Sequence, residues 1–151
     1  MGTGEGAAAA PNRSTVDGGQ QHEHASGVHR TVRWAAAHRI IEEALERNWD
    51  GTLALLYGEC ADKDALERLE RAEEWLKDRP AEAELLLTLG RLCVQRELWG
   101  KAQSYLEASL ATQPTQAAHI ALAKLYERLG RPAEAGRHFR ASADLAQGAP
   151  G

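Results

Sequence analysis

The chain has 151 residues, a net charge of -4 and a pI near 5.9. This length predicts one domain with a tail, because single domains run to roughly 100–200 residues. The acidic balance disfavours nucleic acid as the main partner, since neutralising a phosphate backbone requires concentrated lysine and arginine. No stretch approaches the roughly 18–20 apolar residues that span a bilayer, and the start lacks the features of a signal peptide. A soluble chain without a transmembrane segment is therefore predicted.

Residues 1–32 are predicted to form a disordered, low-complexity tail. They are rich in Gly, Ala, Ser, Gln and His and show no apolar periodicity, so they cannot bury enough surface to offset the entropy of ordering. His22, His24 and His29 lie in this tail. These histidines could bind a metal ion or haem iron, but a disordered segment must become ordered when its ligands bind. The preferred interpretation is a plain polar tail.

From Trp34 onward, apolar residues recur at three- and four-residue spacing, which predicts helices. Pro80 and Pro114 end two of them, Gly130 suits the left-handed conformation after a helix, and Pro132 suits a first turn. The predicted helices cover residues 34–47, a short segment around 53–57, and residues 64–78, 82–96, 99–112, 116–129 and 132–147. The predicted buried faces are Ala37, Ile40, Ile41, Ala44 and Leu45; Leu66, Leu69, Ala72, Trp75 and Leu76; and Ala102, Leu106 and Leu110.

The cysteines and tryptophans are interpreted as packing residues. Cys60 and Cys93 have small or apolar neighbours and no CxxC partner, so they predict buried thiols rather than a zinc site or a disulfide. Trp49, Trp75 and Trp99 stand at helix junctions, where a large ring fills the gap between layers. An exposed contact patch is the alternative use of these rings.

A shift of 33 residues aligns the chain with itself. Small residues fall on small ones and large on large, as in the pairs Gly90 and Ala123, Cys93 and Tyr126, Ala102 and Ala135, Leu106 and Phe139, and Ser109 and Ser142. Small residues where antiparallel helices cross let the backbones approach. A period in the low thirties with two helices per unit indicates a solenoid of stacked helix pairs.

These residues resemble the tetratricopeptide repeat, whose motif is matched by Leu89 and Gly90, Ala102 and Pro114. The resemblance implies an all-α, right-handed solenoid of about seven helices. Its domain covers residues 33–147, divided into a half repeat at 33–47, a degenerate repeat at 50–78, and clear repeats at 82–114 and 115–147.

A narrower resemblance covers roughly residues 37–145. Four segments are similar to the C-terminal repeats of bacterial protohaem IX biogenesis proteins: Asn48-Trp49-Asp50, Tyr57-Gly58, Ala72 to Pro80 with Trp75, and Leu98-Trp99-Gly100-Lys101-Ala102. This resemblance implies a non-enzymatic scaffold associated with late haem biosynthesis and porphyrin metabolism, with late-pathway enzymes as protein clients. It also implies a position on the cytoplasmic side of the inner membrane, through an anchoring helix pair that this chain does not show.

The first helices of the two clear repeats would line the concave side of such a solenoid. By family register, the predicted protein-binding groove is formed by Glu84, Leu87, Arg91, Gln95, Lys124, Glu127 and Arg128. Arg91, Lys124 and Arg128 make a basic strip that could dock an acidic peptide or helix. Ordinary solvated charge is the alternative interpretation of the strip.

No catalytic, metal-binding or cofactor motif is found in the sequence, which predicts neither an enzyme nor a cofactor. His38, His119 and His138 lie in predicted helices and are interpreted as surface or core histidines. Two alternatives to the haem-linked scaffold stay open: a generic adaptor for an unrelated protein client, and direct porphyrin or haem binding. Self-association through Ala141, Leu145 and Ala146 of the last helix is a further possibility, so the oligomeric state is left open.

Overall fold

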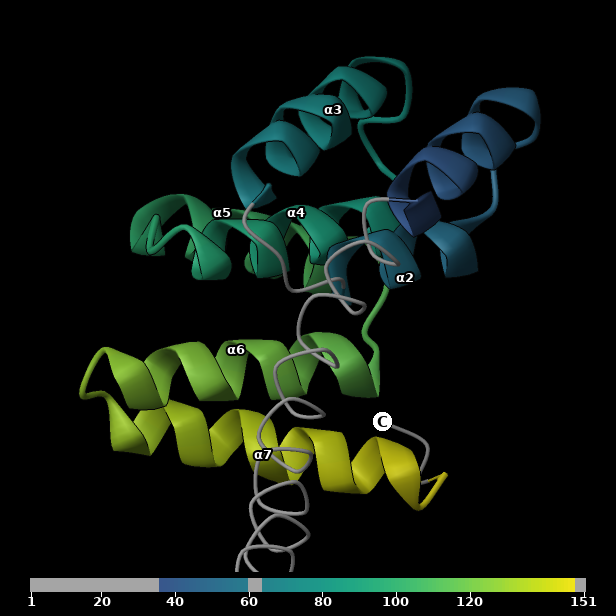
Figure 1. Cartoon of the computed structure of the whole chain (residues 1–151). Helices are drawn as coiled ribbons and strands as arrows, with labels where there is room; N and C mark the ends of the chain where they lie inside the picture. Colours follow the sequence, from purple (N-terminus) through teal and green to yellow (C-terminus); the bar gives the residue numbers. More distant parts are fainter. Residues whose placement is uncertain (1–35, 60–63, 149–151) are drawn as a thin grey trace, which may run out of the picture. The chain divides into compact units, whose positions relative to one another are not determined.

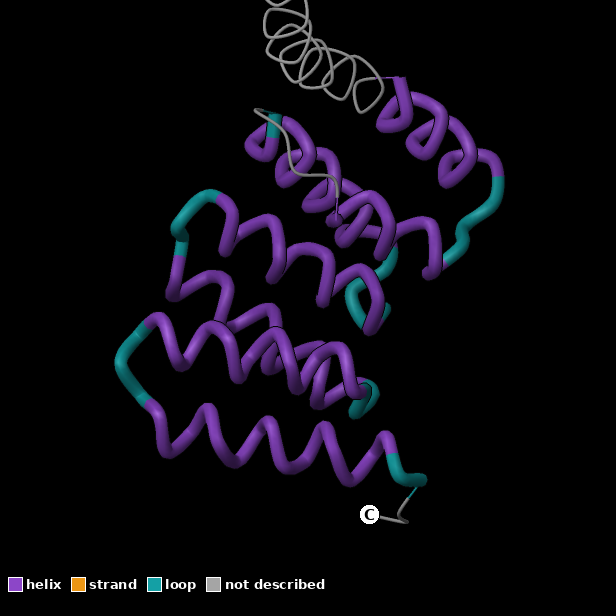
Figure 2. Tube along the Cα trace, turned by 60° about the horizontal axis from the view of Figure 1, so that its bottom comes forward, coloured by secondary structure: helices purple, strands orange, loops and turns teal. Residues whose placement is uncertain are grey.

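The computed structural model describes residues 36–59 and 64–148, and every regular element in these two ranges is a helix (Figures 1 and 2). The chain divides into two compact units, residues 1–40 and 41–151. The predicted tail at 1–32, with its three histidines, lies outside the described residues, and so does Cys60. Within the described ranges, the prediction of an all-α fold is confirmed.

The helix bounds agree closely with the predicted segments. A first helix covers 36–47, and the others are α2 (Gly51–Glu59), α3 (Ala65–Asp78), α4 (Ala83–Gln95), α5 (Trp99–Thr112), α6 (Gln116–Arg128) and α7 (Pro132–Ala146). From α3 onward, each end lies within one residue of its predicted position, because prolines and Gly130 interrupt the helices. In the part of the chain that the structure describes, no helix is long and apolar enough to cross a membrane.

Two residues predicted for buried faces are exposed. Ile40 is 67% exposed whereas Ile41 is 6% exposed, and the boundary between the two units falls between them. Among the described residues, Ile41 is the first that belongs to the hydrophobic cluster. In α3, Leu66 is 44% exposed and Arg68 is buried in its place. Arg68 is three residues after Ala65 and four before Ala72, so it shares their face of the helix.

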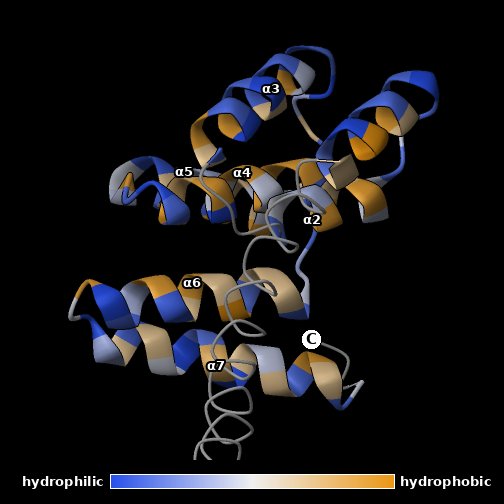
Figure 3. Cartoon of the chain, in the orientation of Figure 1, coloured by the Kyte–Doolittle hydropathy of each residue, from blue (hydrophilic) through white to orange (hydrophobic). Residues whose placement is uncertain are grey.

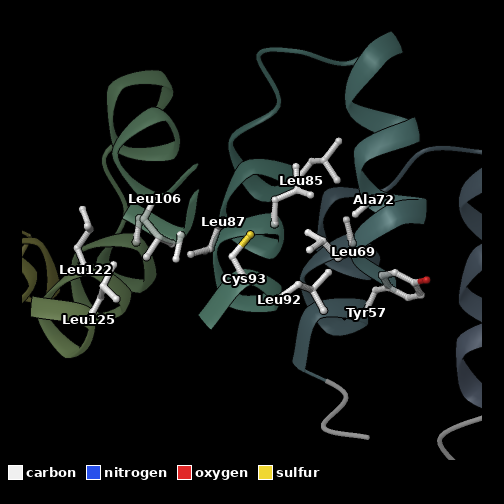
Figure 4. Packing of buried hydrophobic residues seen from close by; sticks show 14 of the residues in the cluster. Tyr57, Leu69, Ala72, Leu85, Leu87, Leu92, Cys93, Leu106, Leu122 and Leu125 are labelled. Atoms are coloured by element: carbon white, nitrogen blue, oxygen red, sulfur yellow. The ribbon is translucent and has the colours of Figure 1, made fainter. Parts of the chain in front are cut away.

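The second unit is built around α4, which packs against α2, α3 and α5, while α6 packs against α5 and α7. Each helix carries both hydrophobic and hydrophilic residues (Figure 3). One hydrophobic cluster joins these helices, running from Tyr57 and Leu69 through Cys93 to Leu106 and Leu125 (Figure 4). The predicted packing of Cys93 is confirmed, because its side chain is fully buried.

The tryptophans at the helix junctions belong to this packing. Trp75 is 8% exposed, and its ring centroid lies 5.1 Å from that of Tyr57 and 5.8 Å from that of Trp49. Trp49 and Trp99 are partly buried against the core cluster. Their interpretation as packing residues is therefore supported by the contacts that they make.

The helix pairs α4–α5 and α6–α7 repeat with an offset of 33 residues. Their starting residues differ by this number, and so do the hydrogen bonds of the turn inside each pair. The Leu98 amide donates to the Cys93 carbonyl, and the Arg131 amide donates to the Tyr126 carbonyl, both over 2.8 Å. This six-residue bond defines a Schellman motif, in which the residue before the donor is left-handed.

The left-handed residue of this motif is Gly130 in the second pair, with φ of 71°, and Glu97 in the first, with φ of 57°. A side chain in this region costs about 1 kcal/mol, which glycine avoids. We therefore expect Glu97→Gly to raise the free energy of unfolding by about 0.5–1 kcal/mol, measured by urea denaturation. Glu97→Ala is the control and should bring no gain, because alanine keeps the strain. Equal effects of the two variants would contradict this account.

Candidate docking pocket

The structure brings four of the seven predicted groove residues to one pocket of about 360 Å³. Arg91 and Gln95 come from α4, and Lys124 and Arg128 come from α6. The full lining is Gly58, Glu59, Arg91, Val94, Gln95, Leu106, Ile120, Ala121, Lys124, Leu125 and Arg128. The pocket thus lies where α2, α4, α5 and α6 meet.

The apolar part of the pocket continues the hydrophobic core. Leu106 is fully buried and Leu125 is 1% exposed, while Val94, Ile120 and Ala121 are partly buried. Val94 of α4 and Ile120 of α6 therefore supply apolar surface that a ligand can reach. A ligand entering here would remove this apolar surface from water, which contributes roughly 25 cal/mol per Å².

The polar part of the pocket is mainly basic. Arg91 is the most buried of its three cations and pairs with Glu59 at 3.5 Å. Lys124 and Arg128 are exposed, and the Arg128 guanidinium lies 5.7 Å from the centre of the Trp99 ring. Three cations against one carboxylate leave a net positive charge, so the pocket favours an acidic ligand. Glu59 would compete with such a ligand for Arg91.

Gln95 lines the pocket and also has a structural role. Its amide nitrogen donates to the Gly58 carbonyl at 2.9 Å, and its amide oxygen accepts from Arg68 Nη2 at 3.2 Å. Arg68 Nη1 also donates to the Tyr57 carbonyl at 3.2 Å. The two side chains thereby bind carbonyls in the last turn of α2, where the helix lacks internal donors and its dipole is negative.

The other predicted groove residues lie elsewhere. Glu84 and Leu87 line a second cavity of about 120 Å³, together with Leu55, Ala83, Ser109, Gln113, Thr115 and Ala117. Leu87 is 3% exposed and belongs to the hydrophobic cluster, so it packs the core instead of presenting a contact surface. Glu127 is exposed and lines neither cavity. The predicted groove therefore separates into a basic pocket, a small second cavity and an exposed acid.

Sequence reasoning missed Glu59, Gly58 and Arg68 as parts of this site. Arg68 had a usable signal, because its spacing from Ala65 and Ala72 places it within an apolar stripe. An arginine there must find partners inside the protein. Glu59 had no such signal, since its pairing with Arg91 joins residues 32 positions apart on different helices.

The remaining titratable candidates are Cys93 and two histidines. Burial raises the pKa of the Cys93 thiol to about 11, so the thiol stays protonated and unreactive at neutral pH. His119 and His138 face each other with their Nδ1 atoms 3.0 Å apart. Burial is the main cause that lowers the pKa of each. Among residues 36–59 and 64–148, no three or more His, Cys, Asp or Glu side chains are grouped to hold a metal ion.

Comparison with models of known protein families gives no match for this chain, and comparison with curated proteins gives none either. Evidence for a function therefore comes from the residues and their geometry.

Proposed function

We propose that the chain is a non-enzymatic protein-docking scaffold of the tetratricopeptide type, a right-handed solenoid whose contact site is the basic pocket. Support for the repeat type comes from the 33-residue offset between α4–α5 and α6–α7. Further support comes from the small residues at the helix crossings: Gly90, Ala102 and Ala123 are fully buried, and Ala135 is 2% exposed. Stacked pairs of this kind present the first helix of each pair to a ligand.

The observation that carries the docking proposal is the pairing of an apolar floor with three cations in one pocket. Val94 and Ile120 are partly buried and offer apolar surface beside Lys124 and Arg128, within about 360 Å³. The ligand that fits is an acidic peptide segment with one apolar side chain. The three cations would attract its carboxylates, and the apolar lining of the pocket would contact its apolar side chain.

The proposed client belongs to late haem biosynthesis. This part of the proposal rests on the resemblance of the Trp49, Tyr57 and Trp99 segments to protohaem IX biogenesis proteins. On the same resemblance, we propose that the scaffold works on the cytoplasmic side of the inner membrane. The alternative is a generic adaptor that binds an unrelated client in the same pocket. The identity of the bound protein distinguishes this alternative from the haem-linked scaffold.

The test compares affinity purification by the intact chain and by the double variant Lys124→Glu, Arg128→Glu, from cytosol and solubilised membranes. Arg91 is left unchanged, because reversing it would set a second carboxylate against Glu59. We expect late haem-pathway enzymes to be recovered by the intact chain, and the recovery to fall at least ten-fold in the double variant. The control is Arg137→Glu, Arg140→Glu on α7, which makes the same change of net charge outside the pocket.

The outcomes separate the alternatives. If the intact chain recovers unrelated proteins and the double variant loses them, the pocket is the docking site, but the chain is a generic adaptor without a link to haem synthesis. Equal loss in both double variants would indicate a non-specific effect of charge and contradict the pocket.

Direct porphyrin binding is the other alternative, and a titration with hemin followed by absorbance tests it. Neither histidine nor cysteine is found among the described residues that line the pocket, so the pocket offers iron no imidazole or thiolate. A hemin spectrum that changes with the intact chain but not with the Lys124→Glu, Arg128→Glu variant would favour this alternative.

A further inference from the structure

A second feature lies on the α6–α7 helix pair, and neither of its two histidines lines the basic pocket. His119 of α6 and His138 of α7 place their Nδ1 atoms 3.0 Å apart, with ring centroids separated by 5.2 Å. Both rings are partly buried. Two imidazole nitrogens therefore converge between neighbouring helices, at a position that solvent can reach.

The separation is close to that of two histidine ligands on one metal ion. With metal–nitrogen distances of 2.0–2.1 Å and tetrahedral angles, two such nitrogens lie about 3.3 Å apart. A slight widening and a turn of the two rings would let both lone pairs meet at one point. We propose that His119 and His138 form a two-histidine binding site for a divalent late transition metal ion such as Zn²⁺.

The protonation of the pair suits this role. Burial and the neighbouring His138 lower the pKa of His119, while burial and Arg137 lower that of His138 against the opposing effect of Glu107 and Glu134. Both rings are thus neutral at neutral pH, which is the form that binds a metal. One ring donates its Nδ1 proton to the other, so that ring must move its proton to Nε2 before both Nδ1 atoms can bind the metal.

The surroundings fix one ring and limit the number of protein ligands. The Tyr126 ring stacks on His138 with centroids 5.5 Å apart. Glu107 accepts the Tyr126 hydroxyl at 3.1 Å, and Glu134 accepts two bonds of 2.6 Å from Arg131. Because both carboxylates are already engaged, water would complete the coordination.

The chemistry of the pair selects the metal. Imidazole nitrogens suit Zn²⁺, Ni²⁺ and Cu²⁺, whereas Mg²⁺ and Ca²⁺ require oxygen ligands. Two histidines from adjacent helices would also link α6 to α7, since the metal binds the folded arrangement and not the unfolded chain. The site would therefore stabilise the last helix pair.

The experiment measures thermal unfolding of the full chain at pH 7.5 with Zn²⁺, Ni²⁺ or Mg²⁺. We expect Zn²⁺ and Ni²⁺ in excess to raise the unfolding midpoint by about 5 °C and Mg²⁺ to leave it unchanged. The double variant His119→Asn, His138→Asn should lose this rise. A variant with His22, His24 and His29 changed to Gln is the control and should keep it, which excludes the histidines of the N-terminal segment as the source.

A second measurement keeps the test independent of the variants' own stability. In the intact chain, Zn²⁺ should shift the imidazole NMR signals of His119 and His138 and leave that of His38 in place. The proposal is overturned if Zn²⁺ fails to move these two signals. It is equally overturned if the midpoint rises as much in the double variant as in the intact chain.

Discussion

Gly90→Ala is expected to lower the free energy of unfolding by about 2 kcal/mol. A Cβ atom at this position would lie 2.4 Å from Cδ2 and 2.5 Å from Cγ of Leu106. Leu106 is fully buried in the hydrophobic cluster, so displacing it would disturb the packing of its neighbours. Overpacking of a core costs about 1–3 kcal/mol, which exceeds the gain of up to about 1 kcal/mol from replacing glycine within a helix.

The matched control for this substitution is Gly136→Ala in α7. The nearest atom to a Cβ there is Arg140 Nη1 at 3.8 Å, an ordinary contact with a flexible side chain. Only the helix-propensity gain remains, so we expect this variant to be more stable by about 0.5–1 kcal/mol. Urea unfolding of both variants measures the contrast.

A double-mutant cycle with Leu106→Val identifies the cause of the Gly90→Ala effect. If the clash with Leu106 is responsible, shortening Leu106 should cost less in the Gly90→Ala background than in the intact chain. Additive effects would contradict the clash. Because Leu106 also lines the basic pocket, the same cycle shows whether crowding at the helix crossing weakens docking.

Local chemistry explains why so much of the helical framework was predictable from the sequence. Pro80, Pro114 and Gly130 act on the residues next to them, so the helix ends they set require no knowledge of the rest of the fold. The 33-residue offset was equally visible, because Gly90 and Ala102 must be small for helices to cross closely. The register of the tetratricopeptide family placed Arg91, Lys124 and Arg128 in one basic strip, and all three line the basic pocket.

The features that were missed depend on contacts between helices or on a backbone conformation that the residue type does not signal. Glu97 occupies a left-handed position where the second repeat has Gly130, and nothing in a glutamate side chain signals that conformation. The contact between His119 and His138 joins two residues that each look like an ordinary helical histidine. Leu87 was assigned to the groove by register, but packing against the neighbouring pairs buries it. Tertiary packing decided each of these positions.

Arg68→Met is expected to lower the free energy of unfolding by about 2 kcal/mol. Methionine retains most of the apolar stem, but it removes the donors to the Tyr57 carbonyl and to the Gln95 side chain. A buried acceptor left without a donor costs about 1–3 kcal/mol, and the last turn of α2 has no internal donor to replace it. Arg68 is 1% exposed, so the substitution also removes the desolvation cost of a buried guanidinium, and this gain offsets part of the loss.

Arg71→Met on the same helix is the control. Arg71 is exposed, and its partners are Glu42 at 3.9 Å and Glu46 at 3.5 Å, so its loss should change stability by less than about 0.5 kcal/mol. Urea denaturation measures both variants. Equal stability of Arg68→Met and the intact chain would mean that desolvation of the guanidinium balances its hydrogen bonds.

The same variant connects the fold to the proposed docking. Gln95 and Gly58 line the basic pocket, and Gln95 donates to the Gly58 carbonyl. Arg68 fixes the Gln95 side chain through a hydrogen bond to its amide oxygen. Arg68→Met should therefore weaken client binding even under conditions where the chain stays folded, whereas Arg71→Met should leave it unchanged. Since Arg68 is not itself a pocket residue, this loss would show that the last turn of α2 must be fixed for the pocket to bind.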